Sequence, residues 1–127
     1  MVDFKKLRVW QIAHLSTLKV YKLTSKLPKS ELFGLVSQLR RAAISVELNI
    51  AESEGRFNKQ EKIQFLYMSR ASSVEVRAAL LIVQDLYQKL NSECDQIYKT
   101  YESFEGQISS LIGYRKKNKP SQPSGPS

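Results

Sequence analysis

Hydrophobic residues recur every three or four positions along most of the chain, with polar residues between them. This spacing is typical of helices that bury one face, and the strict alternation that strands need is absent. Four helices are predicted: about Val9 to Lys26, from after Pro28 to about Glu54, from after Asn58 to about Leu90, and from Asn91-Ser92 to Lys117. The pattern therefore predicts an all-α, antiparallel up-down four-helix bundle.

Local signals mark the ends of these helices. Gly55 is predicted to take the left-handed position that closes the second helix. Asn58 with Glu61 three residues later matches a capping box at the start of the third. We expect residues 1–118 to form the bundle, and residues 119–127, rich in Pro and Ser, to form a disordered tail.

The helices differ in how many apolar faces they carry. The fourth has one stripe, which includes Ile97, Phe104 and Ile108. The third has a main stripe of Ile63, Tyr67, Ala71, Val74, Ala78, Leu81 and Ile82, and a second one of Phe65, Val76, Ala79, Val83 and Leu90, interrupted by Ser72. A monomer would expose such second stripes, so the pattern favours a homo-oligomer. The alternative is that the second and third helices are central and contact neighbours on two sides.

A polar row runs along the second helix. It comprises Gly34, Gln38, Arg41, Ser45, Asn49, Glu52 and Arg56, beside a small apolar patch that includes Phe33, Ile44 and Leu48. Such a row is either a solvated face or a hydrogen-bonded interface, and its mixture with apolar residues favours the interface. The residues expected at the oligomer interface are Phe33, Gln38, Arg41, Ile44, Ser45, Leu48, Asn49, Glu52, Phe65, Ser72, Val76 and Val83.

Charge then narrows the candidate partners. The net charge is +8, and most of the excess lies near the two ends of the chain. This distribution favours a polyanion as partner, although solubility alone also explains it. The side chains expected to contact the phosphates of RNA or DNA are Lys5, Lys6, Arg8, Lys19, Lys22, Lys26, Arg40, Arg41, Arg115, Lys116, Lys117 and Lys119.

The sequence offers no catalytic constellation. His14 has no acidic residue within a helical turn, which favours a boundary histidine over a metal ligand, and Cys94 has no second cysteine with which to pair. There is no Gly-rich phosphate loop. We therefore expect no enzymatic activity, no cofactor and no metal. The polar N-terminal residues and the lack of a long apolar run predict a cytoplasmic protein with no membrane contact.

The segment from Gln38 to Glu52, QLRRAAISVELNIAE, together with FKKLRVWQ from Phe4, carries a resemblance to a known family. It resembles the bacterial four-helix-bundle proteins encoded in intervening sequences of large-subunit ribosomal RNA genes. Ser53 departs from the family pattern, which has Gly there. That family is similar in fold to the accessory variability proteins of diversity-generating retroelements, which form pentameric barrels that engage nucleic acid and a reverse transcriptase. The resemblance implies a pentamer with a basic surface.

Two functions follow as hypotheses. The first is a non-enzymatic oligomeric scaffold that binds RNA or DNA through phosphates with low sequence selectivity. The second is a protein-interaction adaptor, also oligomeric, in which the charge only keeps the protein soluble and no nucleic acid is bound. Nucleic-acid binding that vanishes well below physiological salt would favour the second.

Overall fold

The structure is a computed structural model that describes residues 3–117, and within this range it is helical with no strand. Four α-helices form the fold: α1 (Arg8–Thr24), α2 (Ser37–Gly55), α3 (Lys59–Leu86) and α4 (Asn91–Lys117). A short helix, η1 (Phe4–Lys6), precedes α1. Two more, η2 (Lys29–Glu31) and η3 (Leu32–Val36), lie between α1 and α2, and η4 (Gln88–Leu90) lies between α3 and α4. The predicted four-helix bundle is confirmed.

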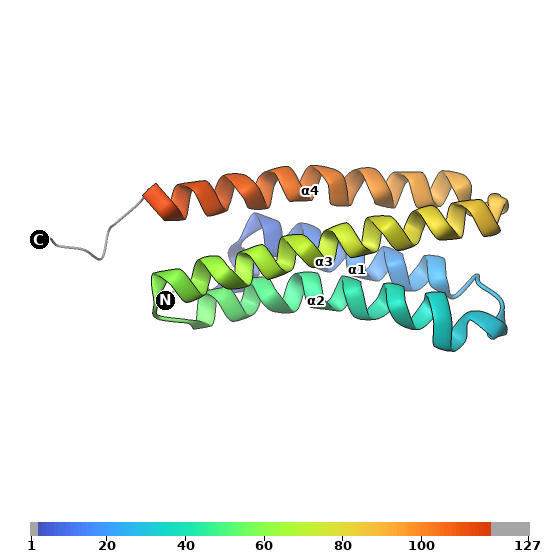
Figure 1. Cartoon of the computed structure of the whole chain (residues 1–127), viewed down its shortest axis with the longest axis horizontal. Helices are drawn as coiled ribbons and strands as arrows, with labels where there is room; N and C mark the ends of the chain where they lie inside the picture. Colours follow the sequence, from blue (N-terminus) through green and yellow to red (C-terminus); the bar gives the residue numbers. More distant parts are fainter. Residues whose placement is uncertain (1–2, 118–127) are drawn as a thin grey trace, which may run out of the picture.

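The helices run up and down in chain order along one long axis (Figure 1). Helix α1 packs against α2 and α4, and α3 packs against the same two helices on the other side. Helices α1 and α3 are therefore diagonal neighbours. The turn between α2 and α3 and the end of α4 lie at the end of the bundle on the left of Figure 1, and α1 begins toward the same end. Both ends of the described chain therefore lie in the same half of the bundle.

The core is a single hydrophobic cluster drawn from all four α-helices. As predicted, α4 contributes one stripe, which includes the fully buried Phe104 and Ile108. Leu15 and Leu18 of α1 are exposed and point away from the core. Small polar side chains allow close packing between helices. The Ser69 hydroxyl donates to the carbonyl of Val46 at 2.7 Å, which joins α3 to α2 without leaving a buried hydroxyl unpaired.

The prediction of which face of α3 points into the core was wrong. The stripe that includes Val76 and Val83, expected at an oligomer interface, is the core face, and both valines are 0% exposed. The face of Val74, Leu81 and Ile82 points outward instead. Both faces have helical spacing, so periodicity alone does not distinguish them. The difference arises because Val76 and Val83 share their face with side chains that pack against or bond to α2 and α4, namely Leu66, Ser69, Ser73 and Leu80.

The predicted second helix is interrupted near its start. A 3-10 turn, η2, and a π-helical segment, η3, precede α2, and Gly34 within η3 has the non-helical angles φ −112° and ψ −108°. The Glu31 side chain lies across this segment, because its carboxylate accepts from the Leu35 backbone N–H at 3.4 Å and from the Tyr87 hydroxyl at 2.6 Å. A Cβ at position 34 would lie 3.1 Å from that carboxylate. Glycine therefore leaves room for Glu31.

The ends of α2 and α3 also differ from the prediction. Gly55 stays within α2, and the chain leaves the helix at Arg56 with φ −91°, so no left-handed residue closes it. Lys62 replaces that cap by donating to the carbonyls of Ser53 and Glu54. Helix α3 ends at Leu86, before the predicted Leu90, and η4 makes the turn to α4. The cap by Asn58 is confirmed, since its side chain accepts from the Glu61 N–H at 3.1 Å.

An ion-pair network joins α3 to α4 at the middle of the bundle. The Arg77 guanidinium donates to both carboxylate oxygens of Glu105, at 2.7 and 2.6 Å, and to the Tyr98 hydroxyl at 3.0 Å. The Ser73 hydroxyl donates to the same carboxylate at 2.7 Å. The Glu105 hydrogen bonds raise the pKa of Arg77 further above its ordinary value. This bidentate pair fixes the register of α3 against α4.

Candidate nucleic-acid and oligomer interfaces

The predicted phosphate-binding side chains divide between the two ends of the bundle. Lys22, Lys26 and Arg40 lie toward the end where α1 meets α2. Lys5, Lys6, Arg8 and the residues from Arg115 to Lys117 lie at the opposite end, with the α2–α3 turn. Lys19 and Arg41 are exposed along the sides of the bundle. Lys119 falls outside the described residues.

The end of the bundle that holds the two chain ends is strongly basic. We call it the basic end; its cations are Lys5, Lys6, Arg8, Arg56, Lys59, Lys62, Arg115, Lys116 and Lys117. Among the described residues only Asp3, Glu52, Glu54 and Glu61 balance these nine charges. The antiparallel topology therefore brings two basic segments, residues 5–8 and 115–117, from opposite ends of the sequence to the same end of the bundle. Sequence reasoning missed Lys59 and Lys62, although an up-down bundle already implied that their turn lies beside both chain ends.

Besides Lys116, whose contact with Tyr67 is described below, three of the predicted cations have partners within the chain. Arg115 lies 2.9 Å from the buried Glu54 carboxylate, and Lys26 lies 2.7 Å from Glu93. Arg40 donates to the Thr24 hydroxyl at 2.8 Å and stacks over the Tyr21 ring at 4.2 Å. These side chains stabilise the fold, so they are less available to phosphate than the prediction assumed. In the described range, no carboxylate lies within ion-pair distance of Lys5, Lys6, Arg8, Lys59, Lys62, Lys116 or Lys117.

A pocket opens at the basic end between the first turns of α3 and the last turn of α4. It has a volume of about 630 Å³ and is lined by Asn58, Lys59, Gln60, Ile63, Gln64, Tyr67 and Lys116. The Lys116 ammonium donates to the Tyr67 hydroxyl at 2.7 Å, and the Lys59 ammonium donates to the Lys116 carbonyl at 3.0 Å. The hydrogen bond from Lys116 lowers the pKa of Tyr67. We call it the basic pocket; sequence reasoning did not identify it.

The polar row of α2 lies partly against α3. The Ser45 hydroxyl is 2.8 Å from that of Ser72, and the Asn49 amide donates to the Ser45 hydroxyl at 3.0 Å. Glu52 pairs with Arg56 at 2.7 Å, and the Arg56 guanidinium stacks over the half-buried Phe65 ring. Gln38 and Arg41 are exposed. The expected hydrogen bonds of the row therefore form within one chain, at its centre and at its Arg56 end, whereas Gln38 and Arg41 near its start are exposed.

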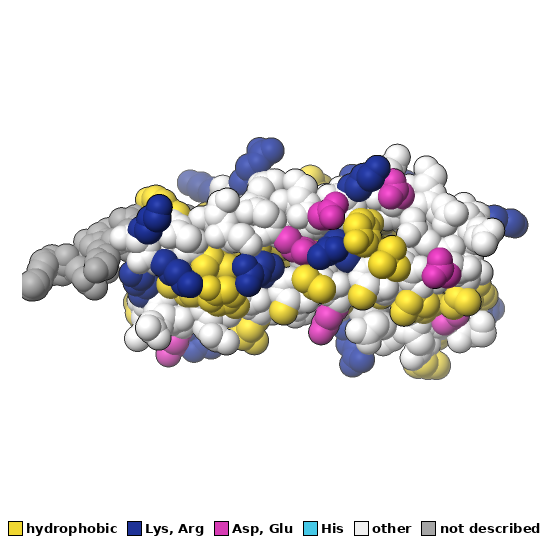
Figure 2. All heavy atoms as spheres, turned by 45° about the horizontal axis from the view of Figure 1, so that its top comes forward, with side chains coloured by type: hydrophobic (Ala, Val, Ile, Leu, Met, Phe, Trp, Pro, Cys, Tyr) yellow, Lys and Arg dark blue, Asp and Glu magenta, His cyan; other side chains and the backbone are white. Residues whose placement is uncertain are grey.

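Two apolar surfaces remain exposed on different sides of the bundle. The first, the α3 face, comprises Ala71, Val74, Ala78, Leu81 and Ile82. The second, the α1–α2 face, comprises Leu15, Leu18, Leu48 and the half-buried Ile44. Figure 2 shows hydrophobic side chains along the line of α3, with Lys and Arg side chains gathered beside them where α3 begins. Among the large hydrophobic side chains of the described residues, Phe33 in η3 is the most exposed, at 93%. Of the apolar residues predicted at the interface, Phe33 and Leu48 are exposed and Ile44 and Phe65 are half-buried.

His14 has a partner that the sequence did not indicate. Its Nδ1 lies 3.0 Å from the Glu47 carboxylate across the α1–α2 contact, and its ring stacks on Trp10 with centroids 4.8 Å apart. The boundary position that we predicted for His14 agrees with this half-buried environment. Among the described residues, no group of three or more His, Cys, Asp or Glu side chains is arranged to hold a metal ion.

Cys94 lies fully buried in the first turn of α4. Burial, with a smaller contribution from Glu93, raises the pKa of its thiol to about 11. We expect a thiol reagent at pH 8 to modify the native protein at least about a hundredfold more slowly than the guanidinium-unfolded protein, because burial blocks access and suppresses the thiolate. Equal rates in the two states would contradict the burial.

The same pKa shift predicts a pH dependence of stability. An unfolded thiol loses its proton near pH 8.5, whereas folded Cys94 keeps it until about pH 11. The unfolded state therefore binds fewer protons between these values, and the contribution of Cys94 to the free energy of unfolding decreases as the pH rises through this window. A Cys94→Ala variant is expected to lose this part of the alkaline dependence in chemical denaturation between pH 8 and 11.

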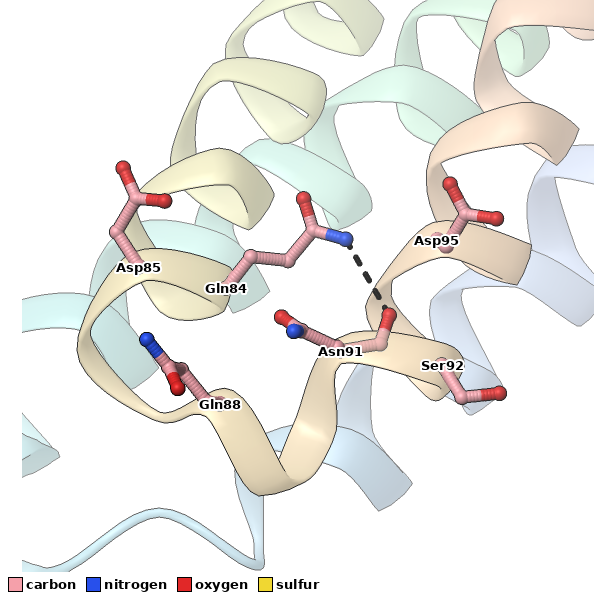
Figure 3. Close-up of a pocket in the computed structure, with 6 residues that line it drawn as sticks. All are labelled: Gln84, Asp85, Gln88, Asn91, Ser92 and Asp95. Carbon is pink, nitrogen blue, oxygen red and sulfur yellow. Dashed lines mark hydrogen bonds between the residues drawn. The ribbon is translucent and has the colours of Figure 1, made fainter.

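Another pocket, at the α3–α4 turn, is polar and has a volume of about 600 Å³. Gln84 donates to the backbone carbonyl of Asn91 at 3.2 Å, and this hydrogen bond spans the pocket (Figure 3). The carboxylates of Asp85 and Asp95 lie on opposite sides of these residues. The two carboxylates do not converge on one point, so the pocket lacks the converging oxygen ligands that a bound cation requires.

Comparison with known proteins places the fold. A crystal structure of a protein with unknown function from the S23 ribosomal protein family of Bacteroides thetaiotaomicron VPI-5482 aligns with a TM-score of 0.73 and 17% identity, covering 82% of this chain and 97% of that one. No curated protein matches the chain. No helix within residues 3–117 is both long and apolar enough to span a membrane. Residues 5–110 match the model of the 23S rRNA-intervening sequence protein family, and the chain therefore belongs to that family.

Proposed function

We propose that this protein is a cytoplasmic, non-enzymatic, homo-oligomeric scaffold that binds RNA or DNA through phosphates with little sequence selectivity. The basic end is the observation that carries the proposal. Seven of its nine cations have no carboxylate within ion-pair distance in the described chain. When unpaired cations on the protein bind the phosphates of a nucleic acid, the counterions condensed on that nucleic acid are released, and this release drives association. Contacts to phosphate carry no sequence information, hence the low selectivity.

The two apolar faces support the oligomer. Helices α1 and α3 are diagonal in the bundle, so the α3 face and the outward part of α1 are on opposite sides. When the α3 face of one copy meets the α1–α2 face of the next, the contact is heterologous, and it closes into a ring when the rotation between neighbouring copies divides a full turn evenly. The resemblance noted in the sequence implies five copies. In a ring each copy presents its basic end in the same direction, so weak phosphate contacts act together.

Salt-dependent binding tests the proposal. The test is fluorescence anisotropy with a labelled structured RNA and a labelled DNA duplex across about 50 to 300 mM salt. Binding is expected to persist near about 150 mM. The association constant is expected to fall by several factors of ten for each tenfold rise in salt, as for a site of several phosphates. Exchanging the RNA sequence at constant length is expected to change the affinity less than about threefold.

A charge variant localises the site. Lys5→Gln/Lys6→Gln/Arg8→Gln is expected to reduce the salt slope by up to about three, because each cation displaces roughly one counterion. Removing the same number of charges at Lys89, Lys99 and Lys29, away from the basic end, is expected to leave the slope within one unit. Complete loss of wild-type binding well below 150 mM salt, with the oligomer intact, would refute the proposal in favour of the protein-interaction adaptor.

A further inference from the structure

We infer that the basic pocket binds one unpaired nucleotide of the bound nucleic acid, with its phosphate between Lys59 and Lys116 and its base against Tyr67 and Ile63. The inference rests on the proposed function and adds to it a specific subsite and a preference for single strands. None of the seven lining residues is acidic. The lining instead combines two ammonium groups, three amide side chains, a phenol and an aliphatic side chain, which together match the chemical groups of a nucleotide.

The two ammonium groups are held in place by neutral oxygens. Lys116 donates to the Tyr67 hydroxyl, and Lys59 donates to the Lys116 backbone carbonyl. Each ammonium carries three protons, so two N–H groups on each are left for a phosphate. No carboxylate of the described chain lies within ion-pair distance of either. A phosphate oxygen therefore meets oriented donors and does not have to displace an internal anion.

The Tyr67 ring provides the flat apolar surface. Lys116 Nζ lies 5.2 Å from the ring centroid and 2.7 Å from the hydroxyl, so it sits at the hydroxyl edge of the ring. Arg70 lies over the ring at 4.9 Å and donates to Ser109 at 3.0 Å, which holds Tyr67 between α3 and α4. A base held against this ring and Ile63 can bond through its polar edge to Asn58, Gln60 or Gln64. In a duplex, the ring face of a base is stacked on its neighbours and its polar edge is bonded to its partner, so only an unpaired base can contact both the ring and the amides. The pocket therefore prefers single strands.

The test uses the full chain with a fluorescein-labelled uridine decamer and a blunt RNA duplex of similar length. Lys59→Gln/Lys116→Gln is expected to weaken decamer binding at least about tenfold near physiological salt, and to reduce its salt slope by about 0.7, which is one single-strand phosphate. Duplex binding is expected to change less than threefold. The charge-matched control Lys89→Gln/Lys99→Gln, outside the pocket, is expected to leave both affinities within about twofold.

Variants of Tyr67 separate stacking from charge. Tyr67→Leu is expected to weaken decamer binding about tenfold with an unchanged salt slope, because base stacking on an aromatic ring is lost. Tyr67→Phe keeps the ring and is expected to stay within threefold of wild type. Circular dichroism of each variant verifies the fold. Equal losses in Tyr67→Leu and Tyr67→Phe would overturn the stacking role.

The outcomes distinguish the pocket from the proposed function. If wild-type protein binds the decamer and Lys59→Gln/Lys116→Gln matches its control, the pocket inference fails while the scaffold remains. If wild-type protein binds neither decamer nor duplex, the proposed function itself fails. Competition identifies the source of the nucleotide. Uridine monophosphate that binds wild-type protein more tightly than the decamer would indicate a free-nucleotide site and overturn the assignment to nucleic acid, whereas weak competition only at millimolar concentrations supports it.

Discussion

Ile82→Asp is expected to convert the oligomer into a folded monomer of 14.6 kDa in light scattering. Ile82 is 50% exposed in the single chain and is the last residue of the α3 face along the helix. In the isolated bundle the new carboxylate points into water, and the change in the free energy of unfolding should stay within about 1 kcal/mol. In the assembly the same carboxylate would be buried without a partner, which costs several kcal/mol per interface. In a ring every copy carries this cost.

The matched control is Ser103→Asp, which adds the same charge to an exposed site on α4 away from both apolar faces. It is expected to keep the wild-type mass. Leu48→Asp, on the other face, should dissociate the oligomer as Ile82→Asp does if the contact is heterologous. An unchanged mass for Ile82→Asp at micromolar concentration would show that the α3 face is not an interface. A monomeric wild-type protein at tens of micromolar would refute the oligomer altogether.

Glu105→Ala is expected to lower the free energy of unfolding by about 2–3 kcal/mol, which for a chain of this length corresponds to roughly 10 °C in Tm. The side chains of Arg77 and Glu105 are only 20% and 15% exposed, so removing the carboxylate leaves a mostly buried cation without its partner. The Ser73 hydroxyl loses the closer of its two acceptors in the same substitution and keeps only the Tyr101 carbonyl at 3.4 Å. Partial exposure places the effect below the range of about 3–5 kcal/mol for breaking a fully buried ion pair.

The double variant Arg77→Met/Glu105→Leu tests that reason. It removes both charges and keeps apolar volume, so it is expected to be destabilised much less than Glu105→Ala, by about 1 kcal/mol or less. Thermal denaturation followed by circular dichroism measures both variants, at one protein concentration because assembly itself raises Tm. Equal destabilisation of the single and double variants would show that the carboxylate contributes by packing and not by pairing with Arg77.

The parts of the candidate site that sequence reasoning found are those that depend on local chemistry. Lys5, Lys6, Arg8 and the residues from Arg115 to Lys117 were predicted from charge runs near the two chain ends. Charge runs do not reveal pairing, and Arg115 proves to be bound to the buried Glu54 on α2. The basic pocket was missed because Lys59, Tyr67 and Lys116 are separated by up to 57 residues and become neighbours only when α3 and α4 pack together.

The sequence by itself determined the number of helices, the cap at Asn58, the single buried stripe of α4 and the net positive charge. These follow from spacing along one helix and from the chemistry of single residues, both of which are local. Only the tertiary structure decided which face of α3 is buried, the break at Gly34, and the gathering of basic residues from both chain ends and the α2–α3 turn. The physical reason is that helical periodicity specifies that a face is apolar but not what covers it. That choice depends on contacts between helices, such as Ser69 with Val46 and Arg77 with Glu105.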